Sequence, residues 1–298
     1  MKRFPLFLPV VFVSLATHAS EYLLPPDGED IVGEVVTITA AYEDTFAKLA
    51  QRYSVGFQEI QDANPGLDPW LPGEGSPVRL PLAFVLPGGE RDGIVINLAE
   101  YRLYYFPPAA TAEERKVVTY PIGIGRTDYP TPQTVTTVVR TIKDPWWTPG
   151  ANARREYKDQ GIDLPKVVPP GPDNPMGKFS MQLAIPSYFI HGTNKPLGVG
   201  QRASLGCIRL YPDDIEALVK VVPYGTKVRI IDQPNKIGRY HGDLYLESHA
   251  YPDAERSLTG VVKEVIRISE NVSAVDWKLA ESIAREATGI PGRVTASL

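Results

Sequence analysis

The sequence predicts a mainly β protein whose central β domain lies between two smaller units that contain helices. The middle of the chain carries short runs of β-branched and aromatic residues separated by turn residues, as in a β-sandwich or barrel-like sheet. Proline (29 residues) and glycine (25 residues) are abundant, and both favour turns. Helical periodicity appears near the two ends of the chain and over residues 213–222.

The first 19 residues have the pattern of a secretion signal. Lys2 and Arg3 precede an apolar stretch over residues 4–16, and Ala19 ends a small-residue cleavage site. The apolar stretch is shorter than the ~20 residues that span a bilayer, and no other segment is long and apolar enough to do so. We therefore expect a cleaved signal peptide over residues 1–19 and, in a bacterium, a periplasmic protein. A short membrane anchor is the alternative.

Residues 36–82 are expected to form a separate α+β unit. The first helix has apolar residues at the spacing of one buried face, namely Phe46, Leu49, Ala50 and Tyr53. Ser54 is expected to cap a second helix, which ends at Asn-Pro-Gly over residues 64–66, before a short strand at 78–80. This order resembles a LysM module, mainly through Ala-Asn-Pro-Gly at 63–66. The resemblance implies binding to the N-acetylglucosamine chains of peptidoglycan or chitin. A helical hairpin that only packs on its neighbour is the alternative.

The central domain is expected over residues 92–232, after a Pro-Gly-Gly linker at 87–89. Its predicted strands lie at 94–96, 101–106, 117–120, 135–139 and 227–231. Asp213 and Asp214 suit the positive end of the helix over 213–222. The C-terminal extension, residues 233–298, is expected to be partly helical, with apolar stripes that indicate packing rather than chemistry.

Composition excludes several function classes. The formal net charge is −4 and no long basic run occurs, which argues against nucleic acid as a partner. The single cysteine, Cys207, rules out an internal disulfide and a cysteine-rich zinc site, and no metal or cofactor is expected. His241 and His249 are interpreted as surface or structural histidines. Cys207 is either an inert buried thiol or a reactive one.

The segment that carries chemistry runs from His191 to Arg209. A thiol becomes a nucleophile when an imidazole accepts its proton or holds it in a thiolate–imidazolium pair. His191 ends an apolar run over residues 185–190, so a strand, a loop and a return can bring it to Cys207. Gly206 permits close approach of a substrate carbonyl, and the N–H groups of Gly206 and Cys207 are candidate donors to an oxyanion. The guanidinium of Arg209 suits a substrate carboxylate.

Residues 190–193 (Ile-His-Gly-Thr) and 204–210 (Ser-Leu-Gly-Cys-Ile-Arg-Leu) resemble the catalytic motif of the L,D-transpeptidases, which have a YkuD-type catalytic domain. Residues 123–126 and 174–177 also resemble segments of that family. The resemblance covers residues 92–232, is closest to the ErfK/YbiS group, and implies a YkuD-type β-sandwich. Leu205 stands where many members have a histidine before Gly-Cys, which leaves His191 as the candidate base.

The resemblance implies that Cys207 attacks the meso-diaminopimelate carbonyl of a tetrapeptide stem. D-alanine leaves, and an amine then takes the acyl group from the thioester. His191 is the implied base, oriented by the backbone carbonyl of Gly192, and Gly206 lies beside the nucleophile. The candidate substrate-binding residues are Arg209, Ser204, Thr193 and Asn194.

The implied partners are the glycan chains and stem peptides of peptidoglycan. The acceptor amine belongs either to a lysine of an outer-membrane lipoprotein, which anchors it to the wall, or to a second stem, which gives a 3-3 crosslink. A cysteine hydrolase that uses water on the same site, and a non-catalytic wall-binding protein, are the alternatives. Trp146 and Trp147 either form a wall of the substrate groove or pack in the core or a lid.

Overall fold

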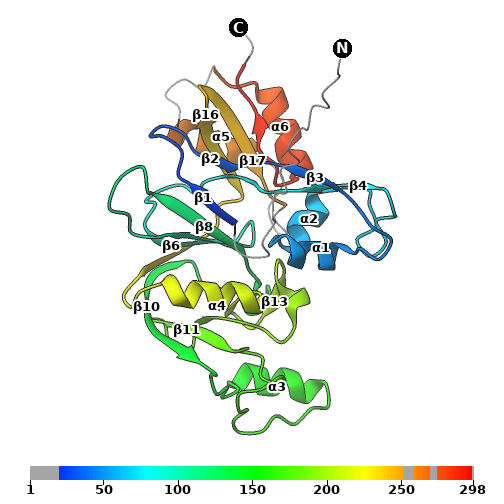
Figure 1. The fold of residues 1–298 in the computed structure, drawn as a ribbon, viewed down its shortest axis with the longest axis vertical. Coiled ribbons are helices and arrows are strands. Elements are labelled where there is room, and N and C mark those ends of the chain that lie inside the picture. The colour runs from blue at the N-terminus through cyan, green and yellow to red at the C-terminus, as the bar shows by residue number, and fades with distance from the viewer. Residues whose placement is uncertain (1–19, 251–257, 269–273, 297–298) are drawn as a thin grey trace, which may run out of the picture.

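The fold is built around one large curled sheet (Figure 1). The computed structural model describes residues 20–250, 258–268 and 274–296, so the signal peptide expected over residues 1–19 lies outside the described residues. The sheet has nine strands in the order β1-β8-β7-β6-β15-β10-β11-β12-β14, which confirms the mainly β prediction. These strands are β1 (Ser20–Leu23), β6 (Gly93–Asn97), β7 (Arg102–Phe106), β8 (Lys116–Pro121), β10 (Thr134–Lys143), β11 (Phe179–Leu183), β12 (Phe189–His191), β14 (Ile208–Arg209) and β15 (Lys227–Ile231).

The centre of this sheet is covered on both faces, which explains its almost continuous apolar strands. Ile94 and Ile96 of β6 enter the main core, to which α4 (Pro212–Val221) contributes Ile215 and Leu218. Val95, between them, points to the opposite face, as expected for successive residues of a strand. There it joins a second apolar cluster, against the short paired strands β2 (Ile31–Gly33) and β5 (Ala83–Val85). Burial on both faces favours such apolar runs over strict alternation.

The N-terminal unit has the predicted order of strand, helix, helix and strand. These elements are β3 (Val36–Thr39), α1 (Phe46–Arg52), α2 (Phe57–Ala63) and β4 (Pro77–Leu80), and they enclose a small apolar core of their own. The predicted cap of α2 is wrong by two residues, because Gly56 and not Ser54 precedes the helix. Ser54 instead has a left-handed backbone (φ 50°), and its hydroxyl donates to the Asp214 carboxylate at 3.2 Å.

The N-terminal unit is joined to the large sheet and to the loop before Cys207 by buried polar contacts. Arg102 of β7 is fully buried and donates twice to Glu59 of α2, at 2.7 and 2.6 Å. The N–H of Phe57 donates to the Val199 carbonyl at 3.5 Å, at the loop that precedes Cys207 in the chain. At Gly200 the backbones are so close that an added Cβ would lie 2.3 Å from the Phe57 nitrogen. The unit is therefore fixed on this loop, and only glycine fits there.

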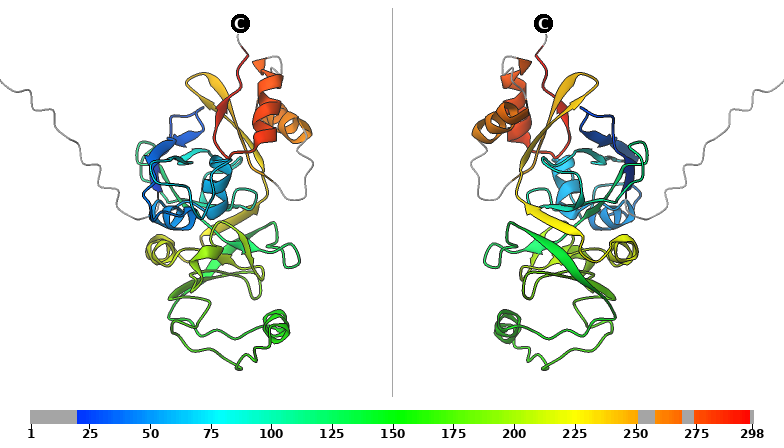
Figure 2. Two further views of the ribbon diagram at one scale, coloured as in Figure 1. Left: turned by 90° about the vertical axis from the view of Figure 1, so that its right-hand side faces the viewer. Right: turned by 90° about the vertical axis from the view of Figure 1, so that its left-hand side faces the viewer.

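The C-terminal extension forms a small α+β unit, in which the hairpin of its first two strands was not predicted. Its elements are β16 (Asn235–Tyr240), β17 (Asp243–Ser248), α5 (Leu258–Ile268), α6 (Trp277–Glu286) and β18 (Gly292–Arg293). The helices lie on the hairpin around a separate apolar cluster, as expected from the stripes in the sequence. This unit lies at the opposite end of the molecule from α3 (Ala151–Asp159), as Figures 1 and 2 show.

The remaining short elements lie near the loop before Cys207. They are β9 (Ile124–Gly125), the 3-10 turn η1 (Pro196–Gly198) and β13 (Arg202–Ser204), which pairs with β9. Within the described residues, no helix is long and apolar enough to cross a membrane.

Candidate active site

The structure brings the predicted site residues together at the edge of the large sheet. Strands β12 and β14 pair in parallel, with Ile190 opposite Ile208 and His191 opposite Arg209. Both isoleucines are fully buried in the main core. Because side chains alternate along a strand, His191 and Arg209 project from the other face, and Cys207 directly precedes β14 in the chain. A loop of fifteen residues in the sequence is thus closed by two neighbouring strands.

His191 is held as a neutral base. Its side chain is buried, and Nδ1 lies 2.6 Å from the Gly192 carbonyl oxygen, the contact implied by the family resemblance. A carbonyl can only accept a hydrogen bond, so Nδ1 carries the proton and Nε2 keeps its lone pair. Burial, together with the positive charge of Arg209, lowers the pKa of His191 to about 3. The imidazole is therefore uncharged at neutral pH.

Cys207 is a neutral thiol in the resting protein. It is partly exposed, and its sulfur lies 3.6 Å from the Ser187 carbonyl oxygen, to which the S–H donates. Burial raises the pKa of the Cys207 thiol, although the Phe189 N–H and the charge of Arg209 act in the opposite direction. Of the two states expected from the sequence, the electrostatics favour a neutral thiol whose proton is taken during the reaction. They disfavour a preformed thiolate–imidazolium pair.

The predicted role of the Gly206 N–H as an oxyanion donor is wrong in this structure. That N–H donates to the Ser204 hydroxyl at 3.1 Å, and the same hydroxyl donates to the Cys207 carbonyl oxygen at 2.5 Å. Ser204 is buried and its contacts are to the backbone around the nucleophile. Gly206 has a left-handed φ of 112°, and a Cβ there would lie 3.2 Å from a ring carbon of Tyr188. Glycine is therefore required at this position for the backbone conformation.

The other predicted binding residues differ in how available they are. Arg209 donates from Nη1 to the Ala203 carbonyl at 3.1 Å, while its buried Nε has no partner among the residues that the structure describes. The Thr193 hydroxyl is buried and accepts from the Lys195 N–H at 2.9 Å. The Asn194 side chain donates to the Pro172 carbonyl at 3.1 Å. The side chains of Thr193 and Asn194 thus stabilise the backbone around them. The Arg209 guanidinium has further N–H groups besides the one that is bonded to Ala203.

The segment over residues 145–174, here called the α3 insertion because it interrupts the large sheet between β10 and β11, contains a helix that sequence reasoning missed. Trp147 pairs with Val168 through two backbone hydrogen bonds, and its ring lies 6.3 Å from that of Tyr157 on α3. Arg126 holds the helix through two 2.7 Å hydrogen bonds to Glu156. The side chains of Tyr157 and Glu156 contribute to the electrostatic surroundings of Arg209, so the insertion reaches the site. Trp147 therefore packs within the insertion.

The same insertion leaves Trp146 largely exposed, with 67% of its surface accessible. At its base, the buried Asn174 side chain donates to the Pro145 carbonyl at 2.8 Å. Asn174 also accepts from the Met176 N–H at 2.9 Å. The segment 174–177, singled out by the family resemblance, thus closes the insertion beside His191.

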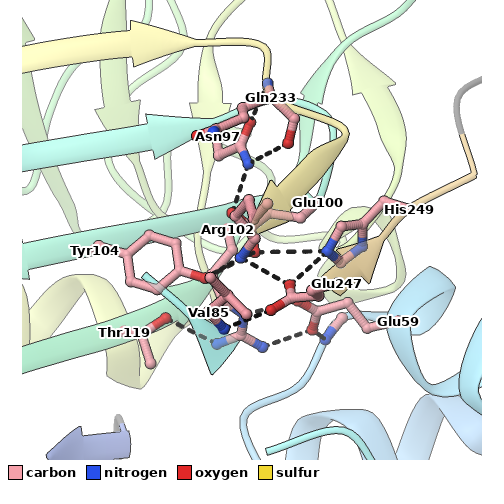
Figure 3. A network of polar contacts seen from close by, with 12 residues as sticks. Glu59, Val85, Asn97, Glu100, Arg102, Tyr104, Thr119, Gln233, Glu247 and His249 are labelled. Carbon is pink, nitrogen blue, oxygen red and sulfur yellow. Dashed lines mark hydrogen bonds and ion pairs between the residues drawn. The ribbon is translucent and has the colours of Figure 1, made fainter. Parts of the chain in front are cut away.

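A second titratable cluster lies away from this site, where the three units meet (Figure 3). Glu100, Glu247 and His249 offer ligand atoms within 4.8 Å of one another, a spacing that suits a metal ion. The fully buried Lys236 ammonium, however, lies 2.7 Å from both carboxylates. The positive charge that such a cluster requires is therefore supplied by the protein itself. His249 is structural, as expected, and His241 is exposed near Glu29.

The β fold, with a lone thiol directly before β14 and a buried imidazole at the end of the paired strand β12, is an arrangement that suits a cysteine enzyme that transfers acyl groups. The YkuD family model, which describes the L,D-transpeptidase catalytic domain, matches residues 91–230. The probable L,D-transpeptidase ErfK/SrfK of Escherichia coli is 40% identical over 298 residues, covering 96% of this chain and 94% of that protein. The chain therefore belongs to the L,D-transpeptidase family.

Other known proteins are also similar to this chain. The probable L,D-transpeptidase YcfS of Escherichia coli is 46% identical over 236 residues, covering 78% of this chain and 72% of that protein. The probable L,D-transpeptidase YbiS of Escherichia coli is 38% identical over 299 residues, covering 97% of this chain and 96% of that protein. A solved L,D-transpeptidase structure from Mycobacterium smegmatis is similar at a TM-score of 0.34 and 16% identity, covering 52% of this chain and 63% of that one.

Proposed function

We propose that this L,D-transpeptidase acts on the tetrapeptide stems of peptidoglycan in the periplasm, with Cys207 as nucleophile and His191 as base. The observation that carries the proposal is the state of the pair: a partly exposed thiol and a buried imidazole whose Nδ1 is held by Gly192. The hydrogen bond to Gly192 leaves Nε2 as the proton acceptor, as general base catalysis requires. Export by the signal peptide expected over residues 1–19 supports the periplasmic location.

In the proposed acylation, the Cys207 sulfur forms a bond to the diaminopimelate carbonyl carbon while Nε2 of His191 takes the thiol proton. The carbonyl π electrons move to oxygen and return as the bond to D-alanine breaks. The departing amine receives the proton from His191, which leaves a thioester. The acceptor amine then attacks this thioester and its proton passes to His191 and on to the thiol, which regenerates Cys207. Arg209 is proposed to bind a stem carboxylate through the guanidinium donors that are not bonded to Ala203.

The acceptor is proposed to be a lysine amine of an outer-membrane lipoprotein, with a second stem peptide as the competing acceptor. The N-terminal unit is proposed to hold the glycan strand. Its exposed apolar side chains, Tyr42, Trp70 and Leu71, are suited to stacking on sugar rings. Tyr42 and Trp70 belong to the two loops that precede α1 and follow α2, which are joined by the Phe46 N–H donating to the Pro69 carbonyl.

The test is to incubate the purified chain with tetrapeptide muropeptides and with each acceptor in turn, and to read the products by mass. We expect released D-alanine and an acceptor-linked tripeptide with the wild type. We expect at least a ~10⁴-fold loss with Cys207→Ala, because the nucleophile is gone. Product formation at the wild-type rate by Cys207→Ala would sink the assignment and favour a non-catalytic role. Tripeptides without any linked acceptor would identify a hydrolase instead.

A further inference from the structure

A threonine that the sequence does not mark lies against the backbone of the nucleophile. Thr131 belongs to the loop between β9 and β10, and its side chain is buried. Its Oγ lies 2.8 Å from the Gly206 carbonyl oxygen and 2.9 Å from the Gly125 nitrogen. A backbone N–H can only donate and a carbonyl can only accept, so the hydroxyl accepts from Gly125 and donates to Gly206. The direction of its single proton is thereby fixed.

The loop that carries Thr131 is stiff. Pro130 and Pro132 flank the residue, and the second of these prolines restricts the backbone of Thr131 itself to extended conformations. Gly125, which donates to the hydroxyl, approaches the nucleophile loop so closely that an added Cβ would lie 3.0 Å from the Gly206 Cα. The hydroxyl is therefore held at a defined place relative to Gly206.

Fixing the Gly206 carbonyl also fixes the next N–H. The Gly206 carbonyl and the Cys207 N–H belong to one planar trans peptide unit, in which they point in opposite directions. Ser204 holds the flanking groups, because its hydroxyl accepts from the Gly206 N–H and donates to the Cys207 carbonyl. The hydrogen bonds of Thr131 and Ser204 orient the peptide units on both sides of the nucleophile. None of these three hydrogen bonds involves the Cys207 N–H.

We propose that Thr131 is a positioning residue that directs the Cys207 N–H at the oxyanion of the acylation step. When the sulfur bonds to the substrate carbonyl carbon, the π electron pair moves to the carbonyl oxygen, and the Cys207 N–H donates to that negative oxygen. The pair returns when the bond to the leaving amine breaks. Donors aligned before the reaction stabilise this charge without reorganisation, so loss of the Thr131 hydroxyl slows acylation. The inference rests on the proposed role of Cys207 as the nucleophile.

The experiment compares two reactions of the same thiol. Acylation by a carbapenem, which is a strained cyclic amide, passes through an oxyanion, whereas alkylation by iodoacetamide displaces iodide and forms none. We expect Thr131→Val to lower the saturating rate constant of carbapenem acylation by about 10- to 100-fold. We expect the alkylation rate and its pH dependence to stay within about two-fold, because the thiol itself is unchanged. Both rates are read from intact mass over time.

Thr131→Ser is the matched control, since it retains the hydroxyl, and it should acylate at close to the wild-type rate. If Thr131→Val does not fold, as judged by its thermal melt, Thr131→Ala, which also lacks the hydroxyl, tests the same ratio of rates. An equal loss in acylation and alkylation would overturn the proposal, and so would unchanged acylation. A wild-type protein that forms no carbapenem adduct at all would instead count against Cys207 as the nucleophile.

Discussion

Two groups of titratable residues lie at different places in the molecule, and their charges are stabilised in opposite ways. At the junction of the three units, Lys236 is paired with Glu100 and Glu247 at 2.7 Å. Burial lowers the pKa of Lys236, but the two carboxylates outweigh it and raise the pKa overall. At the proposed active site, burial is the largest influence on His191 and Cys207 and drives both toward their neutral forms.

The contrast separates a structural cluster from a reactive one. Figure 3 shows carboxylates whose oxygens meet donors from several elements, for example the Val85 N–H on Glu247 and Asn97 on Glu100. Each carboxylate there has an ion-pair partner, so the cluster holds the units together. The proposed active site keeps a neutral imidazole and a neutral thiol, as the proposed proton transfer between them would require.

The largest expected effect is the loss of the unpaired base. His191→Gln retains a polar side chain but removes the basic nitrogen, so we expect the rate of D-alanine release to fall by about 10²- to 10⁴-fold. The thermal midpoint should change little by comparison. His241→Gln, at an exposed histidine, is the control and should be indistinguishable from wild type. Retention of more than a tenth of the rate by His191→Gln would show that another group takes the thiol proton.

Removing the buried Lys236 cation should lower stability and leave activity unchanged, the reverse of the His191 substitution. Lys236→Met keeps the length of the side chain but leaves two buried carboxylates without their cation. We therefore expect the free energy of unfolding to fall by about 3–5 kcal/mol. Acylation per folded molecule should be preserved. Lys220→Met, which breaks an exposed pair with Glu216 on α4, is the matched control and should cost less than about 1 kcal/mol. Urea unfolding curves measure both, and equal costs would contradict the structural reading of the junction.

The smallest effect concerns Asp214, where the N-terminal unit meets α4. Burial raises the pKa of Asp214 from 3.8 to about 7, and the hydrogen bond from Ser54 acts in the opposite direction. Because the folded state holds this proton more tightly, the stabilisation is complete below the unfolded pKa and is lost as the pH rises through about 7. We expect a loss of about 1.4 kcal/mol between about pH 6 and pH 8, equal to one pKa unit.

Asp214→Asn, which cannot titrate, should remove this slope with pH, while Asp213→Asn on the exposed side of the same helix start should keep it. Unfolding curves recorded at both pH values provide the measurement. An identical slope in wild type and Asp214→Asn would mean that a different group titrates at this boundary.

Local patterns predicted the parts of the fold that depend on local physics. The helices at residues 46–52 and 212–221 follow from apolar spacing, and the strands at 93–97 and 102–106 from β-branched and aromatic runs. The segment from His191 to Cys207 was identified because it resembles a family motif. Its strand, loop and second strand are all contained in one short stretch of sequence. The contact between His191 and Gly192 joins neighbours in the chain, so the motif contained it.

The unpredicted parts depend on partners far apart in the chain. Ser54 looks like a helix cap, but its hydroxyl reaches Asp214, 160 residues away. Gly206 looks like an oxyanion donor, but Ser204 occupies its N–H, and Thr131 approaches from 75 residues away. The helix at 151–159 was missed because a mainly charged sequence with a single buried residue, Ala153, carries no apolar stripe. Tertiary packing decides each of these cases, and no window of sequence contains it.

The fixed seat of the N-terminal unit has a geometric consequence. Because α2 shares backbone hydrogen bonds with the loop at Val199 and a buried ion pair with Arg102, the unit cannot swing on its linker. If the N-terminal unit binds the glycan strand as proposed, a saccharide on Trp70 would lie at a constant distance from the Cys207 sulfur. Stem peptides at other distances along the glycan strand would not reach the thiol. The spacing of modified stems along the wall would then reflect the distance between the N-terminal unit and Cys207.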